Sequence, residues 1–127
     1  MSIPVDVADL AKALEDFGAG YLLTVGGQST VKVVTVEPTV TDDVVLVEGP
    51  GKGTVANLAD NSAVTLVFPP REPRGFTLLV DGTAEVDGDD VRVAPATAVL
   101  HRPASHADRP PAPDGCGNDC APLPSGA

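Results

Sequence analysis

The fold is constrained most strongly by a succession of short runs rich in Val, Leu and Thr, each bounded by a turn signal. Gly26–Ser29 separates two of these runs and Asp87-Gly88 separates two more, as the turns of β-hairpins do. The run at 76–86 alternates so that Val86 shares a face with Phe76, which is the period of a half-buried strand. Two of the six runs lie within residues 20–40, one on each side of Gly26–Ser29. The other four lie at 41–49, 62–70, 76–86 and 89–95, and the last could continue through 96–103. Six short strands with hairpin turns favour a small, mostly antiparallel β-barrel over a doubly wound sheet, which needs more helices.

Two segments have helical spacing instead. Residues 4–17 predict an N-terminal helix that Asp6 caps and Gly18 ends. Its apolar stripe consists of Val7, Leu10, Leu14 and Phe17. Residues 51–61 predict one or two helical turns between the third and fourth strands, with inward-facing Val55, Leu58 and Ala59. The expected order is therefore helix, three strands, short helix and three strands.

Composition sets the class of protein and excludes some partners. The 127 residues suffice for one compact domain, and 43% of them are hydrophobic, so a core can form. Aromatic residues make up only 3%, which predicts a core of Val, Leu and Ala. A net charge of −10 with no basic cluster argues against nucleic acid as a partner. The apolar runs are too short to span a membrane and no signal peptide is recognisable, so we expect no membrane association and a cytoplasmic location.

The composition changes near Arg102. The last 26 residues hold six of the thirteen prolines and, as their one large aliphatic residue, Leu123. Such a segment cannot form a core of its own. We therefore expect a barrel domain at 1–101 and a Pro/Gly-rich tail with a cysteine pair at 102–127.

In the barrel region the sequence resembles the pyridoxamine 5′-phosphate oxidase family of split-barrel flavin- and deazaflavin-binding proteins. The resemblance is carried by "VKVVTVEP" (31–38), "VVLVEG" (44–49), "VANLADNSAVTLVF" (55–68) and "LLVDGTAEV" (78–86). Asn57-Leu58, Asn61 and Gly82–Glu85 stand where the family pattern puts them, with Ser62 replacing the usual proline. The resemblance implies a six-stranded antiparallel split barrel that forms a homodimer. It also implies FMN or F420 as cofactor and two-electron redox chemistry on a small-molecule substrate.

The resemblance also implies a position for the cofactor, along the second and third strands and the turn that follows. The residues expected to contact it are Lys32, Val33, Thr35, Val36, Glu48, Gly49, Lys52, Gly53, Thr54 and Asn57. Lys32 keeps one family cation, whereas Glu37 stands where another is usual and Gly53-Thr54 replace a basic pair, with Lys52 one residue earlier. A phosphate could be held by the two lysines, the Thr54 hydroxyl and main-chain N–H groups. The alternative is that Gly49–Thr54 only connects a strand to a helix.

Two acids complete the expected cleft. Glu37 and Glu48 are expected to border it, either binding a polar group of the substrate or standing as solvated acids at strand ends. No arrangement typical of a nucleophilic hydrolase or a Walker loop is present, so no catalytic side chain is assigned and the cofactor would carry the chemistry.

The tail offers a second set of candidate ligands, His101, His106, Cys116 and Cys120. Zinc takes such ligands, but the spacing is not that of a zinc knuckle, so a zinc site, a local disulfide and free side chains all remain open. A cofactor-free dimeric binding module with a metal- or redox-responsive tail is the alternative function. A third option, implied by the resemblance because relatives of this fold bind haem-like molecules, is tetrapyrrole binding with His101 as axial ligand.

Overall fold

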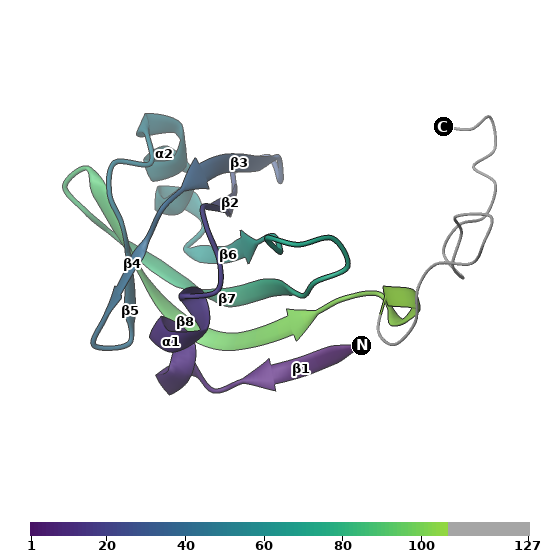
Figure 1. Ribbon diagram of the computed structural model, residues 1–127. Helices are drawn as coiled ribbons and strands as arrows, with labels where there is room; N and C mark the ends of the chain where they lie inside the picture. Colours follow the sequence, from purple (N-terminus) through teal and green to yellow (C-terminus); the bar gives the residue numbers. More distant parts are fainter. Residues whose placement is uncertain (107–127) are drawn as a thin grey trace, which may run out of the picture.

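The computed structural model describes residues 1–106, which form an antiparallel sheet of eight strands with two short α-helices (Figure 1). The strands are β1 (Ser2–Val5), β2 (Gly20–Val25), β3 (Val31–Val36), β4 (Thr39–Thr41), β5 (Val44–Val47), β6 (Ala63–Phe68), β7 (Thr77–Asp87) and β8 (Asp90–His101). The helices are α1 (Leu10–Leu14) and α2 (Lys52–Asp60), and η1 (Val7–Asp9) and η2 (Ala104–His106) are 3₁₀ turns.

The strand order is β3-β2-β6-β7-β8-β5-β4, with β1 paired to β8 off this path. The expected mainly β, antiparallel fold is therefore confirmed, and the sheet stays open between its ends, as in a split barrel. The β2–β3 and β7–β8 hairpins form where the turn signals predict them. The helix between the third and fourth strands also forms, as α2.

The expected count of six strands is wrong, because two strands were missed. One is β4, which the turn Asp42-Asp43 joins to β5. Both aspartates have positive φ, 51° and 64°, as the central residues of a tight hairpin turn require. The acidic pair was expected as the turn that leads into a strand at 41–49, and it is a turn, but one that joins two paired strands.

The other missed strand replaces the start of the expected N-terminal helix. Residues Ser2–Val5 pair with His101 to Ala98 of β8, and helical turns begin only at Val7. The reason is that β5 covers β8 only at Val91–Val93, so the rest of that edge is open for pairing. Asp6 does cap the first turn, accepting the Ala8 N–H at 3.0 Å.

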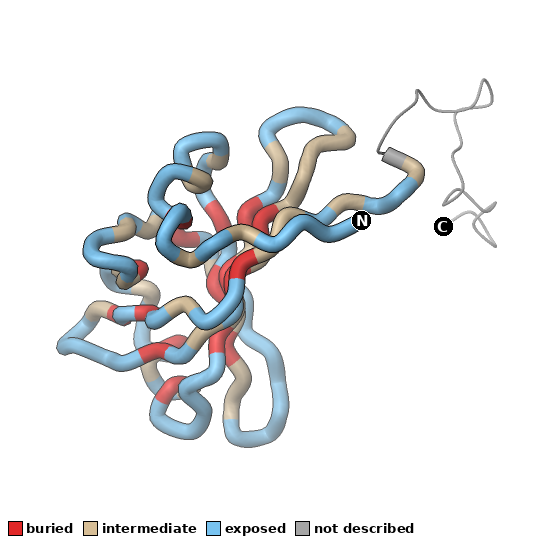
Figure 2. The backbone as a smooth tube through the Cα atoms, turned by 90° about the horizontal axis from the view of Figure 1, so that it is seen from below, coloured by how far each residue is buried: buried red, intermediate tan, exposed pale blue. Residues whose placement is uncertain are grey.

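The buried residues form one core, and Figure 2 shows the buried segments gathered toward the middle of the described fold. It is built from Val, Leu and Ala, as composition predicts, with Phe68 as its one buried aromatic. Val86 is exposed, against the alternation expected for 76–86, because the β7–β8 hairpin extends past the core. On α2, Leu58 and Thr54 are buried whereas Ala59 is exposed, so the inward face is rotated from the expected one.

A break in the pairing marks the middle of the β7–β8 hairpin. Asp81 pairs with Thr97 but Gly82 pairs with Pro95, so β8 carries an extra residue there. Proline cannot donate to the ladder, and such bulges are where strands tolerate it. Within residues 1–106, no helix combines the length and apolar character needed to cross a membrane.

Candidate functional site

The connection from β5 to α2 exposes main-chain N–H groups at the start of a helix. Gly49 and Gly51 have φ of 54° and 109°, a region that favours glycine, and the Gly49 N–H is held by Asp90 Oδ1 at 3.0 Å. The first helical bond runs from the Val55 N–H to the Gly51 carbonyl at 3.1 Å. The N–H groups that precede Val55 on α2 therefore have no acceptor within the helix.

Lys32 lies directly over this helix start. A Cβ built on Gly53 would stand 3.0 Å from Lys32 Cε and 3.2 Å from Nζ, so the absent side chain at Gly53 makes the close approach possible. The first turn of α2 also contains Lys52, has no acidic residue and has no side-chain cap. Helix N-termini normally attract acidic side chains, because the helix dipole is positive there. Two lysines at such an end leave positive charge that an anion would neutralise.

Thr54 follows in the same turn but faces the interior. Its side chain is fully buried, and Oγ1 has no hydrogen-bond partner among the described residues. The structure therefore does not present this hydroxyl at the surface, where the sequence placed it as a possible phosphate contact.

Replacing Thr54 with valine should stabilise the fold. Valine has nearly the same shape and removes a buried hydroxyl that lacks a partner, so the free energy of unfolding should rise by about 1 kcal/mol. Urea unfolding measures it, with Thr54→Ser, which keeps the hydroxyl, as the control. A Thr54→Val protein less stable than wild type would contradict the buried, unpartnered placement.

Asn57 has a structural contact. Its Nδ2 donates to Thr24 Oγ1 at 3.1 Å, which ties α2 to β2 and satisfies a fully buried threonine. The turn at Gly26 packs against the same amide. No spacing in the sequence signals this pair, since 33 residues separate them.

Two clefts flank the turn, each of about 440 Å³. The first is lined by Thr35, Val36, Glu37, Glu48, Gly49 and Pro50. The second is lined by Gly49, Gly51, Lys52, Val55, Ala56 and Asp89. Glu37 and Glu48 thus border one cleft, as expected, and Gly49 belongs to both. Val33, which was expected to contact the cofactor, lines neither cleft. Its side chain is 54% exposed, and strand alternation places it on the opposite face of β3 from Val36.

The described part of the chain does not bring the candidate metal ligands of the tail together. His101 ends β8, with Nδ1 3.2 Å from Ser2 Oγ, and His106 lies in η2. Cys116 and Cys120 lie outside the described residues. Across residues 1–106 no group of three or more His, Cys, Asp or Glu side chains could hold a metal ion, so the metal site stays a prediction.

Comparison with known proteins identifies relatives of this chain. No protein-family model matches the chain. Uncharacterized proteins of Mycobacterium bovis and Mycobacterium tuberculosis are each 40% identical to it, covering 91% of this chain and 92% of their own. The chain belongs to the family of these mycobacterial proteins.

Solved structures show which fold this family has. A candidate pyridoxamine 5′-phosphate oxidase of Listeria innocua has a TM-score of 0.62 and 12% identity, over 74% of this chain and 96% of that one. An FAD-binding protein of Mesorhizobium loti has a TM-score of 0.61 and 15% identity, over 79% and 96%. An F420 reductase has a TM-score of 0.57 and 19% identity, over 68% and 93%. The fold is the split barrel of the pyridoxamine 5′-phosphate oxidase-like proteins, as the sequence resemblance implied.

Proposed function

We propose that the protein binds a flavin-type cofactor, FMN or the deazaflavin F420, and acts as an oxidoreductase on a small molecule. The observation that carries the proposal is Lys32 lying over Gly53 at the uncapped start of α2. Both cofactors have a phosphate, and an anion there would accept hydrogen bonds from the exposed helix N–H groups and from an ammonium. The names of the structural neighbours, FAD-binding protein and F420 reductase, support the same class of cofactor.

The clefts beside the turn supply the rest of the proposed site. A bound flavin or deazaflavin supplies hydride transfer. The chain would anchor the phosphate through Lys32 and the amides of α2. The cleft bordered by Glu37 and Glu48 would receive the substrate, whose polar group the two exposed carboxylates would bind.

The test is the absorption spectrum of freshly purified protein, with any cofactor identified after denaturation. Fluorescence titration with FMN, FAD and F420 then ranks their affinities. A colourless protein that binds none of the three at high micromolar concentration would reject the proposal and favour a cofactor-free binding module.

Replacing Gly53 with alanine should move stability and affinity in opposite directions. Alanine is the better helix former, so unfolding should cost about 0.5 kcal/mol more. The new Cβ would crowd Lys32 Cε and Nζ, and this flexible end would swing away from the α2 amides. Cofactor affinity should fall roughly 3- to 10-fold as the ammonium's hydrogen bond weakens. Titration and urea unfolding measure the two effects.

A double-mutant cycle provides the control for Gly53. In a Lys32→Gln background the ammonium is already absent, so adding Gly53→Ala should leave affinity unchanged. If Gly53→Ala weakens binding equally in both backgrounds, its effect does not pass through Lys32.

We also propose that the protein is a homodimer that buries the outer face of β2 and β3. Tyr21, Val31 and Val33 are 41%, 54% and 54% exposed, and the β2–β3 register puts them on one face. Because β3 ends the described strand path, this apolar face borders an open sheet edge, which proteins normally cover.

Replacing Val33 with serine should weaken this dimer. The change removes apolar area from both copies of a symmetric interface, so the dissociation constant should rise roughly 10- to 30-fold. Analytical ultracentrifugation over a dilution series measures it. Val86→Ser, an exposed valine on the β7–β8 hairpin, is the matched control and should have no effect. Equal effects of both changes would contradict this interface.

A further inference from the structure

A third cleft, which shares no lining residue with the two clefts beside α2, lies between the end of α1 and the loop that joins β6 to β7. Its volume is about 460 Å³. Its apolar walls are formed by Phe17, Pro70, Phe76 and Leu100. Phe17 is backed by Phe68, with ring centroids 6.4 Å apart, and Arg102 lies 4.1 Å from the centroid of the Phe76 ring. Each of the two aromatic rings therefore packs against another side chain of the fold.

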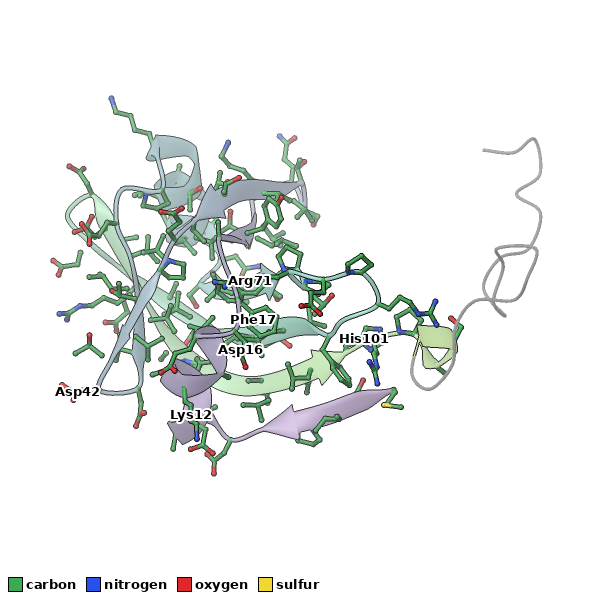
Figure 3. The ribbon with its side chains drawn as sticks, in the orientation of Figure 1. Lys12, Asp16, Phe17, Asp42, Arg71 and His101 are labelled. Carbon is green, nitrogen blue, oxygen red and sulfur yellow. The ribbon has the colours of Figure 1, made fainter. Side chains whose placement is uncertain are left out.

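The rim of this cleft is acidic. Glu15, Asp16 and Glu72 line it beside a single cation, Arg71. Arg71 Nη2 donates to the Phe17 carbonyl at 2.7 Å, so it links the loop to the chain after α1, and Figure 3 shows Asp16, Phe17 and Arg71 together there. The three carboxylates outnumber that one cation, so the rim favours a positively charged ligand.

The chain leaves the described fold beside this cleft. Arg74, in the loop that forms one wall, donates from Nη2 to the Ser105 carbonyl at 2.6 Å. This hydrogen bond ties Ser105 to the loop that carries Gly75 and Phe76. Arg109 lies four positions after Ser105 in the sequence, a span of at most about 14 Å. The first part of the tail is thus within reach of the cleft.

We propose that the chain's own segment Arg109–Pro113, of sequence RPPAP, docks in this cleft. Proline-rich peptides with a P-x-x-P spacing bind grooves lined by aromatic side chains, and Pro110 and Pro113 have that spacing. Their rings would pack on Phe17 and Phe76. Arg109 is the only Lys or Arg in residues 107–127, and it would face the carboxylates of the rim. Docking in cis keeps the segment's local concentration high without a second molecule.

Disulfide trapping in the full chain tests the proposal. In a Cys116→Ser, Cys120→Ser background, cysteines are introduced as Glu72→Cys with Ala112→Cys. The control pairs Ala112→Cys with Glu85→Cys, an exposed position toward the far end of β7. Under mild oxidation of dilute protein, the first pair should form an intramolecular disulfide at least about tenfold faster than the control. Adding Arg109→Glu should remove most of that advantage.

Two results would overturn the proposal. One is equal rates for the two cysteine pairs, which means that the tail has no preference for the cleft. The other is a disulfide that forms only between molecules, which assigns the cleft to the tail of another copy. NMR provides a second test that needs no introduced cysteines. The amide chemical shifts of Phe17 and Gly75 should change with Arg109→Glu but not with the control Pro122→Ala. If neither substitution changes these shifts, docking is rejected.

Discussion

Replacing Lys32 with glutamate should weaken the binding of FMN or F420 roughly 100- to 1000-fold. A charge-assisted hydrogen bond contributes about 1.5–3 kcal/mol, and the substitution adds repulsion between a carboxylate and the phosphate. Lys32 lies over Gly53 at the start of α2, so the new carboxylate would face the phosphate there. Fluorescence titration at low and high salt measures the loss, which should shrink as salt screens the repulsion.

Lys12→Glu is the matched control. It makes the same charge change on an exposed lysine of α1, so it alters the net charge equally. Its effect on affinity should stay within about twofold, because exposed charges beyond a Debye length are largely screened. If both variants lose affinity to the same extent, net charge rather than a local phosphate contact governs binding, and the proposed anchor is wrong.

Replacing Gly82 with alanine should destabilise the fold by about 3 kcal/mol, a large loss for a domain of this size. A Cβ at Gly82 would collide with the Ala94 carbonyl oxygen and would stand 3.0 Å from the Ala94 carbonyl carbon and from Pro95 Cα. These are backbone atoms of the paired strand, so they cannot rotate aside as a side chain would. The midpoint of urea unfolding should fall with an unchanged slope.

The same substitution at Gly18 is the control. A Cβ there meets nothing within 4 Å and φ is not in the left-handed region, so Gly18→Ala should change stability by less than about 1 kcal/mol in either direction. A Gly82→Ala protein as stable as the Gly18→Ala protein would show that the bulge can widen without loss.

Much of the fold was predictable because strand and turn signals are local. Gly26–Ser29 and the turn at Gly88 specify hairpins by their own backbone preferences, and both hairpins form. The missed strand β4 precedes a turn signal of this kind, Asp42-Asp43, whereas the missed strand β1 had none. Residues 4–17 have a helical stripe, and pairing of Ser2–Val5 depends on the edge of β8 that β5 leaves uncovered about ninety residues later.

The candidate site was predictable only in part. The sequence placed Lys32, Lys52 and the glycine turn in one region, and the structure brings Lys32 onto Gly53. The sequence did not reveal that Thr54 faces inward or that Asn57 is hydrogen-bonded to Thr24. Nor did it reveal that Asp90 accepts the Gly49 N–H, 41 positions away. These contacts join segments distant in the chain, so no local pattern encodes them.

The amino-acid sequence by itself determined the class of fold, the hairpin turns and the composition of the core, because these depend on backbone preference and on the alternation of apolar residues. Only the tertiary structure decided which face of α2 is buried, which lysine lies over its first turn, and which cleft lies beside the start of the tail. The physical reason is that each of these depends on how elements far apart in sequence pack against one another, and close packing fixes the direction of the side chains.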